Sequence, residues 1–246
     1  MATIHDEESK QTIIDIIKQD LLLDLNKLIR ALELYLIYYV ENKQIEVATK
    51  LDIVESLEID NIITFNYTHT YEYLYDKDKN SYDYIHGRAN KNGLNLDTCN
   101  MVLGIDEYLD SPDRNTNNIF IDFKKFYQRI FKKTGCKYRE WIESINNFNL
   151  IYTKAKKQEI NIFFYGHSLD ITDKDIIEAL IKNHSTRTTI FYHNREALGK
   201  LIANLVAILG EEYVITNTGG LKPSIVFKAI NEEDFDLVNG NTSEGI

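Results

Sequence analysis

The sequence predicts an α/β fold in which a mostly parallel sheet is flanked by helices and preceded by a helical region. Short β-rich runs alternate with helical patterns from about residue 59 onward. One of these runs, "INIFFYG", is apolar almost throughout, as a strand covered on both faces should be. Before residue 59, apolar residues recur with helical spacing. We therefore expect a single domain over residues 1–246, with a helical region at 1–58 and an α/β core at 59–246.

The helical region carries its clearest pattern between Glu7 and Asn42. Apolar residues such as Ile13, Ile17 and Leu21 lie three or four positions apart, which predicts one long helix or two stacked helices. The segment "LYLIYYV" is apolar almost all round, and this predicts that it is buried with its tyrosines packed.

The core contains strand and helix patterns that are separated by polar turns. We expect strands at 61–65, 82–87, 101–106, 160–166, 186–194, 213–217 and 224–230. We expect helices at 68–75, 119–147 with a break near Thr134 and Gly135, 171–184 with Thr172 and Asp173 as cap candidates, and 195–210.

Composition narrows the function classes. The formal net charge of −10 removes the overall attraction to phosphate backbones, so we expect no general nucleic-acid binding. A basic run does occur, and we interpret it as a solvated helix face; it comprises Lys124, Lys125, Arg129, Lys132, Lys133 and Lys137.

Cysteine usage and hydropathy point to a reducing cytoplasm. Cys99 and Cys136 lie far apart, so they predict neither a disulfide framework nor a four-cysteine zinc site, and we expect no metal. No apolar run reaches the roughly 20 residues that a membrane span needs, and the N-terminus does not resemble a signal peptide.

The segment "FFYGHSLD" raises the possibility of a serine hydrolase. Gly166-His167-Ser168 follows a strand, as in the nucleophile elbow G-x-S-x-G, and Ser168 would then be the nucleophile. Asp170 replaces the second elbow glycine, and the only histidines after Ser168 are His184 and His193, which follow it closely. We keep this hypothesis as the third alternative.

Three polar turns follow predicted strands, where ligands bind in open α/β sheets. They are Asn66-Tyr67-Thr68, His86-Gly87 and Gly166-His167-Ser168, and we expect them to line one crevice. The amide of Asn66 could hold a water or a ribose hydroxyl, and His86 could accept a proton. This pair suits cleavage of an N-glycosidic bond, because the oxocarbenium ion needs a positioned water rather than a strong nucleophile.

Each of these residues also has a structural interpretation. Asn66 could cap the next helix or adopt a left-handed turn, and His86 could be a packed histidine beside a turn glycine. His167 and Ser168 could bond only the backbone of their own turn. The occurrence of these residues at successive strand ends favours the functional interpretation.

The ordered set of motifs resembles a known family. "NIITFNYTHTYEYLY", "YIHG", "MVLGID", "FKKFYQRIFKKTGCKYREW", "FFYGHSLDITDKDI" and "IFYHN…LIANLVAILG" together resemble the AbiH family of bacteriophage abortive-infection proteins over about residues 60–210. The same skeleton is similar to the SIR2-like domains of antiphage defence, which carry an N-Y-D turn, an H-G turn and a G-x-S-L turn in this order.

This resemblance implies a Rossmann-like (SIR2-like) fold in a bacterial defence protein, with NAD as a substrate and an NAD glycohydrolase activity. It places the catalytic residues at Asn66 and His86 and the nucleotide contact at Gly166 and Ser168. The full set of expected nucleotide-binding residues is Thr64, Tyr67, Thr68, Gly87, Gly166, His167, Ser168, Asp173 and Asn194. The expected partners are a nucleotide, a second copy of the chain, or a phage or host protein that acts as trigger.

The chain departs from the family pattern at three places. Thr68 stands where the SIR2-like group has an aspartate, and the zinc-binding cysteines of true sirtuins are missing. No glycine precedes Gly87, so the Gly-rich turn G-N-G-F-D that would bind a pyrophosphate is missing too. A truncated homologue with a weakened or lost nucleotide site is therefore expected, and a non-catalytic binding or regulatory module is the main alternative to the enzyme.

Overall fold

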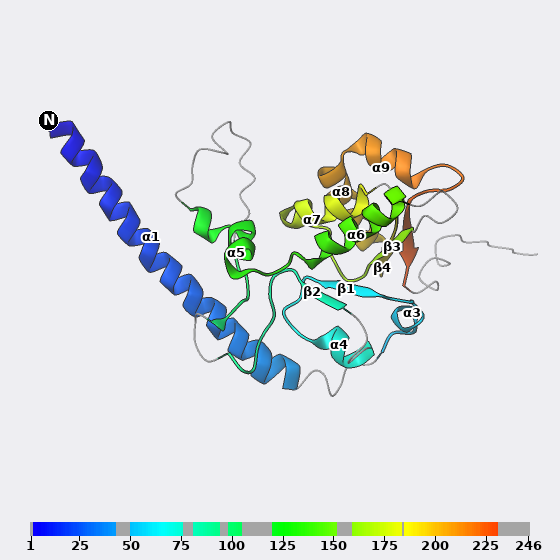
Figure 1. Cartoon of the computed structure of the whole chain (residues 1–246), viewed down its shortest axis with the longest axis horizontal. Helices are drawn as coiled ribbons and strands as arrows, with labels where there is room; N and C mark the ends of the chain where they lie inside the picture. Colours follow the sequence, from blue (N-terminus) through cyan, green and yellow to red (C-terminus); the bar gives the residue numbers. More distant parts are fainter. Residues whose placement is uncertain are drawn as a thin grey trace, which may run out of the picture. The chain divides into compact units, whose positions relative to one another are not determined.

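The computed structural model describes residues 2–42, 50–75, 81–93, 98–104, 120–151, 159–183 and 185–230, with side chains from residue 12 onward. The chain divides into two compact units, residues 1–138 and 139–246 (Figure 1). Each unit is described by itself, and the expectation of a single domain stays a prediction.

The first unit begins with the predicted helical region. Helix α1 (Ala2–Tyr35) continues directly into the π-helical turn η1 (Leu36–Glu41), and a short helix α3 (Asp52–Glu55) follows. The second half of α1 packs along one side of the loop that follows the second strand (Figure 1). The buried residues of this contact are Ile29, Ile37, Ala89, Cys99 and Met101.

The prediction that the tyrosines of "LYLIYYV" are buried is wrong. Tyr35, Tyr38 and Tyr39 are 55%, 62% and 57% exposed, and the rings of Tyr35 and Tyr39 stack on each other at 5.6 Å. In η1 only Ile37 and Glu41 are buried. The helix meets the rest of its unit along one side, so an apolar pattern that runs all round it leaves its other side exposed.

Two parallel strands form the sheet of the first unit. Strand β1 (Asn61–Thr64) leads through a turn into α4 (Thr70–Tyr75), and β2 (Ser81–Tyr84) pairs with β1 so that Thr64 lies opposite Tyr84. Residues 101–104 form no strand, which makes the strand prediction wrong for this segment, and residues 105 and 106 lie outside the described residues. One backbone hydrogen bond holds the segment, from the Val102 N–H to the His86 carbonyl at 2.8 Å, and side chains hold the rest, since Gln128 Nε2 donates to the Leu103 carbonyl at 3.1 Å.

The helical segment after residue 119 breaks where the sequence predicts. It comprises η4 (Ile121–Phe123), α5 (Lys125–Lys132) and α6 (Lys137–Ile151). Between α5 and α6, Gly135 has φ +69°, and a Cβ atom there would lie 2.3 Å from the Ile85 carbonyl oxygen. A glycine is therefore required at this break.

The second unit holds a three-stranded parallel sheet of order β3-β4-β5. Its strands are β3 (Ile160–Phe164), β4 (Thr186–Tyr192) and β5 (Ile225–Ala229), and its further helices are η6 (Ile171–Asp173), α7 (Lys174–Ile181), α8 (Arg195–Leu209) and α9 (Glu211–Thr218). Helices α7 and α8 pack on β4, and α9 packs beside β5 (Figure 1). Buried Ile176, Ile190 and Leu205 mark the core.

The predicted strand at 213–217 is wrong, because these residues belong to α9. Gly210, at φ +89°, ends α8 and lets the chain turn into a new helix. Glu211 and Glu212 lie in its first turn, where carboxylates stabilise the positive end of the helix dipole. An apolar run as short as "YVI" does not separate strand from helix by its pattern.

The described residues thus form a mixed α/β structure in which every strand pair is parallel. This confirms the predicted class. The described strands make two sheets, of two and three strands, and the Rossmann-like assignment stays a prediction.

Candidate functional site

Two of the three predicted turns lie at the same edge of the first sheet. Because β1 and β2 are parallel neighbours, their carboxyl ends meet, and the Ile85 amide continues the pairing by donating to the Thr64 carbonyl at 3.0 Å. The turn Asn66-Tyr67-Thr68 follows β1, and His86-Gly87 follows β2. The third turn, Gly166-His167-Ser168, belongs to the second unit.

The turn after β1 presents amide and hydroxyl groups. Asn66 is exposed, and its backbone N–H donates to Thr64 Oγ1 at 3.1 Å, so Thr64 shapes the turn. Thr68 Oγ1 and Thr70 Oγ1 lie 3.0 Å apart. The hydroxyl of Tyr67 donates to the Val102 carbonyl at 2.7 Å, which fixes the tyrosine ring against the neighbouring loop.

The turn after β2 is closely packed. His86 is only 6% exposed, and its ring lies 5.7 Å from that of Phe65 and 6.4 Å from that of Tyr67. Gly87 adopts φ +74°, and a Cβ atom there would lie 2.1 Å from the Asn100 carbonyl oxygen. The backbone of this turn therefore demands glycine, and the His86 ring is packed among aromatic rings.

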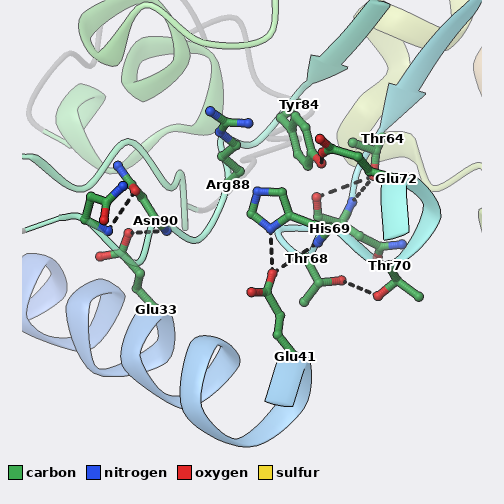
Figure 2. A network of polar contacts seen from close by, with 12 residues as sticks. Glu33, Glu41, Thr64, Thr68, His69, Thr70, Glu72, Tyr84, Arg88 and Asn90 are labelled. Carbon is green, nitrogen blue, oxygen red and sulfur yellow. Dashed lines mark hydrogen bonds and ion pairs between the residues drawn. The ribbon is translucent and has the colours of Figure 1, made fainter. Parts of the chain in front are cut away.

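A second histidine at the same edge is held by a buried carboxylate (Figure 2). His69 Nδ1 lies 2.6 Å from Glu41 Oε1, and the backbone N–H of His69 donates to the same oxygen at 3.1 Å. The Glu41 side chain is 5% exposed, whereas the His69 side chain is 28% exposed. The carboxylate thus fixes the ring and the main chain of His69 together.

Tyr84 and Arg88 border His69. The rings of His69 and Tyr84 lie 5.6 Å apart, and the Arg88 guanidinium lies 5.7 Å from the centre of the Tyr84 ring. Tyr84 donates its hydroxyl proton to Glu72 Oε2 at 3.1 Å. Burial, and next the Glu72 carboxylate, raises the pKa of Tyr84 well above its ordinary value. Tyr84 therefore serves as a neutral hydrogen-bond donor at this edge.

His69 and Glu41 are not among the site residues that the sequence predicts. His69 carries a signal, because it is a titratable residue directly after the Asn66 turn and before a helix. Glu41 carries none, because it lies 28 residues away in a helical region where an acidic residue predicts a solvated face.

A separate buried charged cluster joins α1 to the loop after β2. Glu33 is fully buried and forms an ion pair with Arg30. Its carboxylate also accepts from the Asn90 N–H at 3.1 Å (Figure 2). Burial raises the pKa of the Cys99 thiol to about 11, and the hydrogen bond with Glu33 adds to this rise. Burial also lowers the pKa of Lys132, whose ammonium donates to the Met101 carbonyl. The cluster holds the loop that carries Asn90 and Cys99 in place.

In the second unit, the predicted residues lie at the carboxyl ends of β3 and β4. Gly166 has φ +66°, Ser168 is exposed, and the Ser168 carbonyl accepts from Asn204 Nδ2 at 2.9 Å. His167 Nδ1 accepts from the Leu169 N–H at 2.9 Å, while its Nε2 lies 3.6 Å from Asp173 Oδ2. This imidazole supports its own turn, as the structural interpretation expects.

Helix caps account for further contacts in the second unit. The Asn194 side chain accepts from the Ala197 N–H at 2.8 Å and caps α8. The predicted cap residue Thr172 is instead capped, because Asp170 Oδ1 accepts from its N–H at 2.9 Å. Asp173 occupies the cap position of α7 without a cap hydrogen bond from its side chain, and His184 lies outside the described residues.

The described residues contain neither a metal-binding cluster nor a membrane-spanning helix. Among the described residues, no group of three His, Cys, Asp or Glu side chains is arranged to hold a metal ion. In the same part of the chain, no helix combines the length and the apolar character that crossing a bilayer requires.

Comparison with known proteins identifies the family. A search of curated proteins and a search of solved structures both find no match. A family model described as "Bacteriophage abortive infection AbiH" matches residues 1–193, which include α1, both strands of the first unit, and β3 and β4 of the second. The match covers well over half of the chain and all but one of the predicted site residues. The chain therefore belongs to the AbiH family of bacteriophage abortive-infection proteins.

Proposed function

We propose that this chain acts in antiphage abortive infection by binding NAD at the carboxyl ends of β1 and β2 and hydrolysing its nicotinamide N-glycosidic bond. One observation carries the proposal. The parallel pairing of β1 with β2 brings the Asn66 turn and the His86-Gly87 turn to one sheet edge, where Asn66 is exposed. Strand ends of this kind are the usual ligand sites of open α/β sheets.

The chemistry needs few protein groups. The nicotinamide ring leaves as a neutral base, so the protein must hold the ribose and place a water beside the developing oxocarbenium ion. The exposed Asn66 amide offers a donor and an acceptor for that water or for a ribose hydroxyl. The sequence predicts His86 as the proton acceptor, and activation by a phage or host protein is part of the proposal.

Nicotinamide release tests the proposal. Purified protein is incubated with NAD, with and without lysate from phage-infected cells, and nicotinamide is measured by chromatography. We expect release that Asn66→Ala lowers by at least 100-fold, because the water loses its support. Ser168→Ala is the comparison variant, because Ser168 belongs to the third predicted turn, which lies in the second unit. It shows whether the loss of activity is specific to the Asn66 turn. Absence of nicotinamide release by the wild-type chain under both conditions would overturn the proposal.

A non-catalytic nucleotide-binding module is the second candidate. It is favoured by the burial of His86, which is 6% exposed and packed against Phe65 and Tyr67. A thermal shift by NAD or ADP-ribose that Asn66→Ala removes, without any nicotinamide release, would support this candidate.

A further inference from the structure

The geometry points to His69, oriented by Glu41, as the catalytic base at the carboxyl ends of β1 and β2, with Glu41 as its positioning residue. The inference rests on the proposed function for the identity of the bond that is cleaved. Neither residue belongs to the predicted Asn66 and His86 pair.

Glu41 fixes the state of the His69 ring. Glu41 Oε1 accepts from the backbone N–H of His69 and lies 2.6 Å from Nδ1, so Nδ1 carries a ring proton, and in the neutral imidazole Nε2 carries the lone pair. Figure 2 shows Nε2 on the side of Arg88 and Tyr84, away from Glu41. A buried carboxylate on one ring nitrogen and a lone pair on the other is the arrangement of an oriented general base.

The fold brings Glu41 to this place through the end of the N-terminal helix. Glu41 is the last residue of η1, a turn with the wider π-helical spacing, and π-helical turns are frequent at functional sites. Ile37, about one turn earlier, is buried in a cluster with Ala89 and Met101, and Glu41 is the other buried residue of η1. Glu41 is therefore held by packing as well as by its hydrogen bonds.

The groups around His69 come from four segments. Glu41 approaches from η1, Glu72 from α4, Tyr84 from β2, and Arg88 from the loop that follows β2 (Figure 2). Tyr84 and Glu72 are joined by a hydrogen bond of 3.1 Å, and Arg88 lies over the Tyr84 ring. The exposed Arg88 guanidinium supplies a positive charge at the site and can attract an anionic ligand such as a pyrophosphate.

Accessibility separates the two histidines of this edge. The His69 side chain is 28% exposed, and the whole of His86 is 6% exposed. His69 directly follows Asn66-Tyr67-Thr68 in the chain, so it lies in the same connection between β1 and α4 as the proposed water-binding amide of Asn66. A base must reach the proton that it removes, and the exposed ring meets this requirement better than the packed ring.

The proposed step balances as follows. The water oxygen forms a bond to the anomeric ribose carbon, and the bond from that carbon to the nicotinamide nitrogen breaks with its electron pair going to the ring, which leaves neutral. The water proton moves to His69 Nε2, and the resulting imidazolium is stabilised by Glu41. The proton is later released to solvent, giving ADP-ribose, nicotinamide and one proton.

Three variants of the full chain test the inference. His69→Gln should lower kcat by about 100- to 10,000-fold, the usual contribution of a general base. Glu41→Gln keeps an oxygen that accepts from Nδ1 and from the backbone, yet it removes the charge, so the acidic limb of the pH–rate profile should move to lower pH. Glu55→Gln is the matched control, because Glu55 pairs with Lys50 at the surface. It should leave activity unchanged.

Loss of structure is separated from loss of the base by rescue. Added imidazole should restore part of the activity of His69→Ala, and a variant that is merely unfolded would gain nothing. Melting curves of all variants are recorded beside the kinetics. A His69→Gln enzyme with the wild-type kcat and pH profile would overturn the inference, even where the wild type hydrolyses NAD as proposed.

A second assay decides the inference if the wild type releases no nicotinamide, a result that overturns the proposed function alone. Cells expressing each variant are challenged with phage, and plaques are counted. His69→Gln with a wild-type melting temperature should abolish protection, while Glu55→Gln should retain it. Full protection by His69→Gln would refute the role of His69. A wild-type chain that is inactive in both assays would refute both proposals.

Discussion

Replacing Gly87 with alanine should destabilise the first unit far more than the usual cost of a glycine-to-alanine change. The residue has φ +74°, a conformation that costs an alanine about 1–2 kcal/mol. Its new Cβ atom would also lie 2.1 Å from the Asn100 carbonyl oxygen, a backbone atom that is not free to rotate away. Relief of such an overlap typically costs about 1–3 kcal/mol. We expect a total loss of about 2–5 kcal/mol.

Gly166 offers the matched control, because it shares the conformation and lacks the overlap. Its φ is +66°, and a Cβ atom there would meet nothing within 4 Å. Gly166→Ala should therefore cost only the conformational part, about 1–2 kcal/mol. The difference between the two variants isolates the contribution of the close approach to Asn100.

Native-state hydrogen exchange measures the two costs separately, since amide protection reports the opening free energy of each region. Amides of β2 report on the unit of Gly87, and amides of β3 report on that of Gly166. In a melting experiment, a loss of about 3 kcal/mol in a unit of this size should lower Tm by about 9 °C. A Gly87→Ala protein that loses no more protection than Gly166→Ala would refute the reasoning.

Three further predictions concern stability. Glu33→Ala should lower the free energy of unfolding in urea by about 3–5 kcal/mol, because it leaves Arg30 without its buried partner. Lys27→Ala breaks an exposed pair with Asp24 and should change the free energy of unfolding by less than about 0.5 kcal/mol. Equal effects of the two substitutions would contradict this prediction. The pKa of the Cys99 thiol is near its ordinary 9.0 in the unfolded state and about 11 in the folded state, so the unfolded state loses its proton first. The free energy of unfolding should therefore fall by about 1–3 kcal/mol as pH rises from 9 to 11. Cys99→Ala should reduce this pH dependence, measured as the difference between the free energies of unfolding from urea titrations at pH 8 and pH 10.5. An unchanged difference would mean that other groups cause the pH dependence. Asn194→Ala should cost about 1 kcal/mol by loss of the α8 cap, while Asn194→Asp should retain the cap; equal melting temperatures for all three proteins would exclude a capping role.

The strands that were predicted correctly are those whose own residues and flanking turns favour a strand. β-rich runs such as "NIITF" and "INIFF" are bounded by polar turns and fold as β1 and β3. The segment at 213–217 has an equally apolar centre, yet Gly210 and the two glutamates after it start a helix there. Residues 101–104 have the pattern of a strand, although they make a single backbone hydrogen bond to His86 and otherwise bond side chains such as that of Gln128. Local pattern does not reveal which partner a short apolar run will find.

The meeting of Asn66 and His86 at one sheet edge was predictable because parallel strands bring their carboxyl ends together. Their environments were not predictable. His86 is packed between Phe65 and Tyr67, while Asn66 remains exposed, and this difference depends on where the loop after β2 folds back. That loop is fixed in part by the buried Glu33, which no local pattern distinguishes from a surface glutamate.

The N-terminal helix therefore contributes to the site as well as to packing. It supplies two buried carboxylates, Glu33 to the backbone of Asn90 and Glu41 to the ring and backbone of His69. Burial of a carboxylate is costly unless hydrogen bonds and opposite charges compensate it, so each of these residues constrains the segment it contacts. Glu33 is compensated by Arg30, which points to a structural role. Glu41 faces an imidazole whose second nitrogen lies toward Arg88 and Tyr84, and a carboxylate placed in this way can support proton transfer as well as structure.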